Sequence, residues 1–157
     1  MKVLVIYDSM YGNTKKVAET VAENLKHFHG VELLAVTDLD SKILSDTDFL
    51  VVGTPTQGGR PTENIQKFLD RLEMNSLQGT KVAAFDTRFS EQNQNFALRT
   101  LLRTVGYAAP RITDALKIKG GDLVAPPEGF IVSNKKGPLA NGELERAKTW
   151  AISLATL

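Results

Sequence analysis

Short apolar runs alternate with longer helical repeats along most of the chain. The runs 3–7, 49–52 and 81–85 are apolar almost throughout, which is typical of strands covered on both faces. Between them, apolar residues recur at spacings of three and four, as from Val17 to Phe28 and from Ile65 to Leu72. This second pattern predicts helices with one buried face.

The second half of the chain continues the alternation. Residues 31–36 and 123–132 add two further strands, and residues 144–154 carry the apolar stripe of a last helix. Five strands alternating with helices predict an α/β fold with three layers: a five-stranded, mostly parallel sheet with helices on both faces. Pro126 and Pro127 interrupt the last strand and cannot donate to a central ladder, so we expect it at a sheet edge or with a bulge.

Composition narrows the classes of function. A length of 157 residues predicts one domain, residues 1–157. The absence of cysteine excludes disulfides, thiolate nucleophiles and iron–sulfur clusters, and 19 basic against 18 acidic residues argue against nucleic-acid binding. No apolar stretch reaches the ~18–20 residues that cross a membrane. The apolar run at the start is too short for an export signal, so we expect a cytoplasmic protein without membrane insertion.

The loop after the first strand (residues 8–14, the first loop) holds most of the candidate chemistry. In an open parallel sheet, ligands bind beyond the carboxyl ends of the strands. Ser9, Tyr11 and Thr14 bring hydroxyls, Asn13 an amide, and the next residues begin a helix. These neutral donors at a helix N-terminus predict a site for a phosphate group. Neither the P-loop pattern nor the dinucleotide fingerprint fits, because both require additional glycines.

Two further loops leave the same edge of the predicted sheet. In the second loop (residues 53–61), Gly58 and Gly59 permit positive φ, although a plain turn explains them equally well. The third loop (residues 86–90) offers a cation, Arg88, and an aromatic, Phe89.

Together the three loops resemble the flavodoxin family over nearly the whole chain. Ser9-x-x-Gly12-x-Thr14 is similar to the family's phosphate loop, and Thr54-Pro55-Thr56 to the start of its second flavin loop. The run Tyr7–Thr14 most resembles the flavodoxin module of flavodiiron proteins, and flavodoxin-like quinone reductases share parts of it. The resemblance implies the strand order 2-1-3-4-5, with FMN where the order reverses.

The resemblance also implies which residues bind FMN, and no catalytic acid, catalytic base or metal is expected. Ser9, Met10, Tyr11, Gly12, Asn13 and Thr14 would hold the phosphate; Pro55, Thr56, Gln57, Gly58 and Gly59 would pass one edge of the ring; Asp86, Thr87, Arg88 and Phe89 would line its pyrimidine side. A peptide flip at Gly58 or Gly59 would present a carbonyl to the flavin N5–H.

The second loop departs from the family because it has no aromatic residue. Phe89, or else Tyr11 or Phe96, is therefore expected to stack on the ring, while Tyr107 and Trp150 are expected to be packing residues.

Charge is the other departure from the family. Arg88 is expected to favour the anionic reduced flavin and to raise its potential by about 0.1 V. Lys135 and Lys136 are expected to be solvated. A net charge of +1, in place of the acidic surface of many members, suggests a different kind of partner.

Three functions follow. The first is an FMN-binding electron carrier, a monomer or weak dimer, that serves a redox partner protein or a small-molecule electron acceptor. The second is an FMN-dependent NAD(P)H:quinone-type oxidoreductase, whose substrate pocket would use Gln92, Asn93, Gln94 and Asn95 in the long connection Thr87–Ala108. A helix is expected within that connection, near 96–105. The third is an interaction module without flavin.

Overall fold

A computed structural model describes residues 1–90 and 95–157. Its strands all run parallel in one sheet, in the order β2-β1-β3-β4, with β5 and β6 both paired to β4. The strands are β1 (Lys2–Tyr7), β2 (Gly30–Ala35), β3 (Phe49–Pro55), β4 (Lys81–Arg88), β5 (Asp122–Leu123) and β6 (Glu128–Ile131). The predicted α/β class and strand order are confirmed.

The last strand differs from the sequence-based expectation. One strand was expected over 123–132, but the structure has two short ones, which pair in succession with the outer side of β4. Pro126 and Pro127 lie between them. Because proline has no N–H to donate, the ladder is interrupted there, and the interruption falls at the sheet edge as expected.

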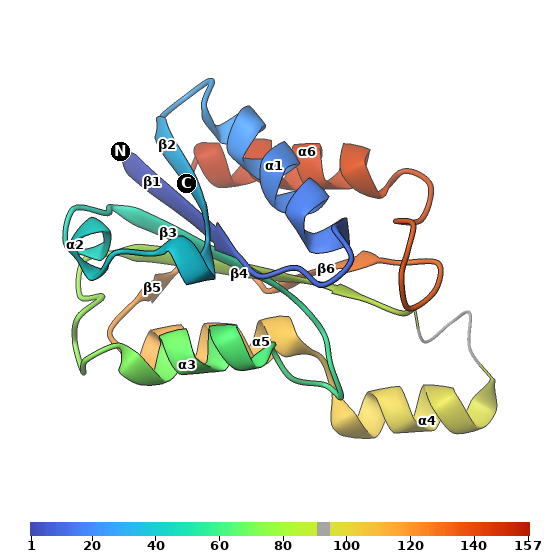
Figure 1. Ribbon diagram of the computed structural model, residues 1–157. Helices are drawn as coiled ribbons and strands as arrows, with labels where there is room; N and C mark the ends of the chain where they lie inside the picture. The colour runs from blue at the N-terminus through green and yellow to red at the C-terminus, as the bar shows by residue number, and fades with distance from the viewer. Residues whose placement is uncertain (91–94) are drawn as a thin grey trace.

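Helices cover both faces of the sheet (Figure 1). The helices of the chain are α1 (Asn13–Leu25), α2 (Ser41–Leu44), α3 (Glu63–Arg71), α4 (Phe96–Val105), α5 (Ala108–Ile118) and α6 (Glu143–Ala155), with a short 3₁₀ turn η1 (Val36–Asp38) after β2. α1 and α6 pack side by side on one face, and α3 and α5 cover the other. Each face has its own apolar core, because the central strands are apolar on both sides.

Trp150 belongs to the core between the sheet and α6. Its ring meets Phe85 and Phe130 edge-on, with centroids 5.9 and 6.0 Å apart, and the residue is 9% exposed. This geometry is favourable for aromatic packing, and the expected packing role is confirmed.

The expected helix near 96–105 is present as α4, and it extends away from the body of the molecule (Figure 1). It follows the end of β4 and returns through Gly106 and Tyr107 to α5. Its path matters for the site, because it brings Tyr107 back to the carboxyl end of the sheet. No helix of the described residues is long and apolar enough to cross a membrane.

A charged cluster fastens α6 to β6. The Glu143 carboxylate accepts hydrogen bonds from the Ile131 N–H (2.6 Å) and from Arg146, whose guanidinium also pairs with Glu128 at 2.8 Å and lies over the Phe130 ring. Burial pushes the pKa of Glu143 upward, but the donors from Arg146 and Ile131 outweigh it and hold the pKa below the usual value of 4.5.

The free energy of unfolding should therefore fall in acid through Glu143. Below about pH 5 the unfolded chain takes up the proton before the folded chain does, so stability is lost as the pH drops through the lower, folded pKa. Glu143→Gln should cost about 1–3 kcal/mol at neutral pH and should flatten this acid slope. Urea unfolding at several pH values measures both effects. Glu145→Gln, an exposed change in the same helical turn, should keep the wild-type slope.

Candidate functional site

A cavity of about 730 Å³ opens at the carboxyl ends of β1, β3 and β4. Of the fifteen residues predicted to bind a cofactor, all but Gly12 and Asp86 line it. Five further lining residues come from other segments: Leu101, Gly106, Tyr107, Val132 and Lys135. The volume is within the ~300–1,000 Å³ of small-molecule sites.

The first loop ends at a helix N-terminus whose N-cap residue, Gly12, has no side chain. Gly12 is the N-cap of α1 with φ 91°, and because it has no side chain it supplies no capping oxygen to the N–H groups of Asn13 and Thr14. The Ser9 Oγ accepts from the Gly12 N–H at 3.1 Å and, more weakly, from the Lys15 N–H at 3.4 Å. The Ser9 hydroxyl proton therefore stays available to a ligand, next to amides that favour an anion.

Two threonine hydroxyls join the first loop to the end of β4. Thr14 Oγ1 and Thr87 Oγ1 lie 2.8 Å apart, and both residues are buried beside the cavity. One hydroxyl donates to the other, so the pair keeps one O–H that can donate to a ligand.

Asn13 lies at the cavity as expected and also holds a neighbouring segment. Its side-chain Nδ2 donates to the Lys136 carbonyl at 3.1 Å, and Gly137 packs against its amide. Asn13 lines the cavity, but its side-chain N–H₂ holds the segment after β6. The backbone N–H of Asn13, at the first position of α1, has no acceptor within the helix and can donate to a ligand.

The second loop is a tight hairpin around its two glycines. Gln57 and Arg60 exchange both backbone hydrogen bonds, at 2.8 and 3.0 Å, and Gly58 and Gly59 between them have φ 56° and 76°. Positive φ at both positions defines a type I′ turn, which favours glycine. Thr56 anchors the hairpin, because its N–H donates to the Thr87 carbonyl and its Oγ1 accepts from the Ala108 N–H.

Asp86 and Arg88 form a two-bond ion pair at the end of β4. Arg88 Nε donates to one carboxylate oxygen at 2.6 Å and Nη2 to the other at 2.7 Å, while Asp86 is fully buried. The Ala109 N–H, in the first turn of α5, donates to the same carboxylate at 2.8 Å. Burial raises the pKa of Asp86, and the donors from Arg88, Ala109 and Thr56 offset only part of that effect.

This pair corrects two expectations. Asp86 does not line the cavity: it is a buried support that holds Arg88 in place. Arg88 does line the cavity, but the premise that it brings an uncompensated positive charge is wrong, because the Asp86 carboxylate neutralises it at 2.6 Å. The shift of about 0.1 V in flavin potential, which assumed a lone charge, therefore has no basis in this geometry.

Tyr107 is the aromatic residue that the sequence assigned to packing alone. The Arg88 guanidinium carbon lies 3.8 Å from its ring centroid, and the half-buried ring lines the cavity. On the neighbouring strand, any side chain at Gly129 would strike the Arg88 guanidinium, since a Cβ there would lie 2.2 Å from Nε. Glycine at position 129 thus allows Arg88 to lie flat between β6 and Tyr107.

The remaining missed residues have different explanations. Val132 and Lys135 directly follow β6, so the rule that selected the other loops would have found them if applied to the last strand. Leu101, Gly106 and Tyr107 lie in the long connection Thr87–Ala108, whose length indicated a functional segment, but the sequence does not show which of its residues reach the cavity. Of the expected substrate-pocket residues, Gln92, Asn93 and Gln94 lie outside the described residues.

Comparison with known proteins agrees with this architecture. The family model described as Flavodoxin matches residues 5–101, more than half of the chain. A curated flavodoxin from Clostridium saccharobutylicum is 30% identical over 161 residues, covering 99% of this chain and 96% of the relative. A curated NAD(P)H dehydrogenase (quinone) from Chromohalobacter salexigens is 27% identical, covering 76% of this chain and 79% of the relative.

Solved structures share the fold at lower identity. A flavodoxin from the domain Archaea has a TM-score of 0.78 at 23% identity, covering 99% of this chain and 97% of that chain. The flavodiiron protein from Giardia intestinalis has a TM-score of 0.74 at 19% identity and covers 99% of this chain, which spans 35% of that protein. At these identities the two structures support the fold alone.

Proposed function

The chain belongs to the flavodoxin family, and from that premise we propose that residues 1–157 form one FMN-binding domain with the cofactor in the cavity at the strand ends. Flavodoxins bind FMN and pass electrons to redox partners, so this protein is an FMN-binding electron-transfer protein. The observation that carries the proposed site is the convergence of three separate loops on one cavity of suitable size.

The phosphate end of FMN would lie against the first loop. The N–H groups of Asn13 and Thr14 at the start of α1, the Ser9 hydroxyl and the Thr14–Thr87 hydroxyl pair offer several neutral donors in one place. A phosphate monoester needs such a cluster, because its three terminal oxygens are strong acceptors. The residues present therefore fit the charged end of FMN.

The ring of FMN would lie toward the second and third loops. Phe89, Leu101 and Tyr107 supply apolar surface, and the Gly58–Gly59 turn places backbone amides at the cavity without side chains in the way. Positive φ at both glycines leaves the peptide between them able to reverse at low steric cost. These residues would position the ring, limit its contact with water and place backbone groups beside it.

Bound FMN would supply the redox chemistry, with one or two electrons exchanged per encounter. The chain itself would hold and shield the cofactor and would provide no acid or base. Its partner is a redox protein or a small-molecule acceptor. A cytoplasmic location stays a prediction from the sequence.

A titration with FMN tests this function directly. The purified protein should bind FMN with a dissociation constant in the micromolar range or tighter, turn yellow and quench flavin fluorescence. A well-folded, colourless protein that does not bind added FMN would contradict the proposal and favour the interaction module without flavin.

A quinone reductase is the second candidate function. It is favoured by the curated quinone-dehydrogenase relative and by the apolar extension of the cavity through Leu101 and Tyr107. Steady-state NAD(P)H oxidation by the FMN-loaded protein with a quinone distinguishes a quinone reductase from an electron carrier. Rapid turnover identifies the enzyme; slow turnover together with reversible reduction of the bound flavin identifies the carrier.

A further inference from the structure

We propose that Lys135 provides the positive charge that faces the phosphate of FMN, and that the segment between β6 and α6 (residues 132–142, the β6–α6 loop) is an additional wall of the cofactor site. This inference rests on the proposed FMN site and names a contact beyond the three loops described above.

The first loop lacks charge for its ligand. Residues 8–14 contain no lysine or arginine. A phosphate monoester carries about −1.5 to −2 charges at neutral pH, and neutral donors leave much of that charge without a counter-ion. Lys15, the next residue, lies outside the cavity lining, and its ammonium group is 4.0 Å from Glu19.

The β6–α6 loop is fastened directly onto the start of α1. Asn13 Nδ2 donates to the Lys136 carbonyl at 3.1 Å. A Cβ on Gly137, which has φ 96°, would lie 2.5 Å from the Asn13 side-chain oxygen, so the loop approaches as closely as a glycine allows. Lys136 and Gly137 therefore contact Asn13 in the proposed phosphate site, and Lys135 is the residue just before them.

The loop is also internally braced. The Ser133 N–H donates to the Pro138 carbonyl at 2.9 Å, the Gly137 N–H donates to the Asn134 carbonyl at 3.0 Å, and Val132 bridges to Leu139. A braced loop can hold a side chain at the cavity at lower entropic cost than a loose one.

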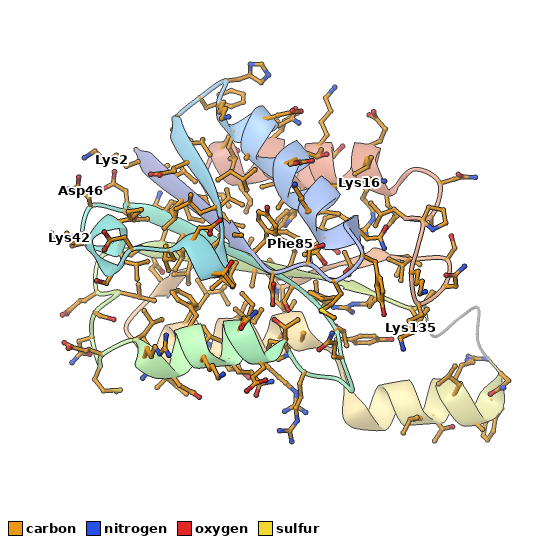
Figure 2. All side chains as sticks on the ribbon, viewed as in Figure 1. Lys2, Lys16, Lys42, Asp46, Phe85 and Lys135 are labelled. Carbon is orange, nitrogen blue, oxygen red and sulfur yellow. The ribbon has the colours of Figure 1, made fainter. Side chains whose placement is uncertain are left out.

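Lys135 is the cation that this loop contributes to the cavity. It lines the cavity, and Figure 2 shows it at the end of the sheet where the first loop lies. Within residues 1–90 and 95–157, no carboxylate lies within ion-pair distance of its ammonium group. Arg88, the other cation lining the cavity, is already paired with Asp86. The neighbouring Lys136 differs, because its Nζ lies 6.0 Å from the Tyr11 ring centroid and it does not line the cavity.

A charge at this position should act on the phosphate and not on the ring. Riboflavin has the same ring as FMN without the phosphate, so it separates the two effects. Lys135 should strengthen the binding of FMN but not of riboflavin, and added salt should weaken its contribution.

The test compares FMN and riboflavin binding to the flavin-free full chain by fluorescence quenching, for the wild type and for Lys135→Gln. The dissociation constant for FMN should rise about tenfold at ~0.01 M ionic strength, whereas that for riboflavin should change less than about twofold. At ~1 M salt the difference between the two proteins should shrink. Lys135→Arg, which keeps the charge, should stay close to the wild type.

Lys42→Gln is the matched control, because it removes one exposed lysine from α2, at the opposite end of the molecule (Figure 2). It should leave both dissociation constants unchanged. The inference is wrong if Lys135→Gln binds FMN as tightly as the wild type does. It is also wrong if the affinity for riboflavin falls by the same factor as the affinity for FMN. In both cases the proposed FMN site itself is still supported. If the wild type binds neither flavin, the proposed function itself fails.

Discussion

Replacing Asp86 with alanine should lower the free energy of unfolding by about 3–5 kcal/mol, the largest effect we expect from a single substitution in this chain. The change leaves the Arg88 guanidinium without its two carboxylate acceptors in a place where that side chain is only 19% exposed. It also leaves the Ala109 N–H without its acceptor in the first turn of α5. Urea unfolding of the flavin-free protein measures the loss.

Asp46→Ala is the matched control for this prediction. Its carboxylate pairs with Lys2 at 2.6 Å, the same distance as in the Asp86–Arg88 pair, but both side chains are largely exposed. Surface pairs contribute little because water solvates both partners, so the unfolding curve should hardly move. The double variant Asp86→Ala/Arg88→Met should recover part of the loss, since it removes the unpaired charge. Equal effects of Asp86→Ala and Asp46→Ala would contradict the buried-pair interpretation.

The fold was predictable because its signals are local. Consecutive apolar residues in 49–52 and 81–85 indicate strands buried on both faces, and the structure has β3 and β4 there. The two prolines at 126 and 127 correctly placed the last strand at an edge. The split into β5 and β6 was not predicted, because the pattern does not show where the ladder resumes after the prolines.

The site was predictable only where it follows a strand end. All three loops were found by that rule, and thirteen of the fifteen residues predicted in them line the cavity. The Asp86–Arg88 pair also had a signal that the sequence analysis did not use: residues two apart on a strand point to the same face. Tyr107 had no such signal, because its place depends on how the chain returns from α4.

Tyr107 lines the cavity with an aromatic ring, and we expect that ring to replace the aromatic residue that the second loop lacks, which gives the second large effect. Tyr107→Ala should weaken FMN binding about ten- to a hundredfold, if a flavin ring gains from stacking about what a base gains. The Arg88 guanidinium covers the ring at 3.8 Å from its centroid and fixes its orientation beside the cavity. Fluorescence quenching by the flavin-free protein measures the change, and far-ultraviolet circular dichroism checks that the variant folds.

Two comparisons show whether Tyr107 stacks on the flavin ring: riboflavin against FMN, and Phe89→Ala against Tyr107→Ala. Stacking acts on the ring, which riboflavin and FMN share. Tyr107→Ala should therefore raise the dissociation constants of riboflavin and FMN by the same factor, whereas Lys135→Gln should raise that of FMN alone. Tyr107→Phe keeps the ring and should bind both flavins within about threefold of the wild type. Phe89→Ala tests the residue that the sequence favoured for stacking. If Phe89→Ala no longer binds flavin while Tyr107→Ala still does, the flavin ring stacks on Phe89 in the third loop. Tyr107 then serves only to support the Arg88 guanidinium.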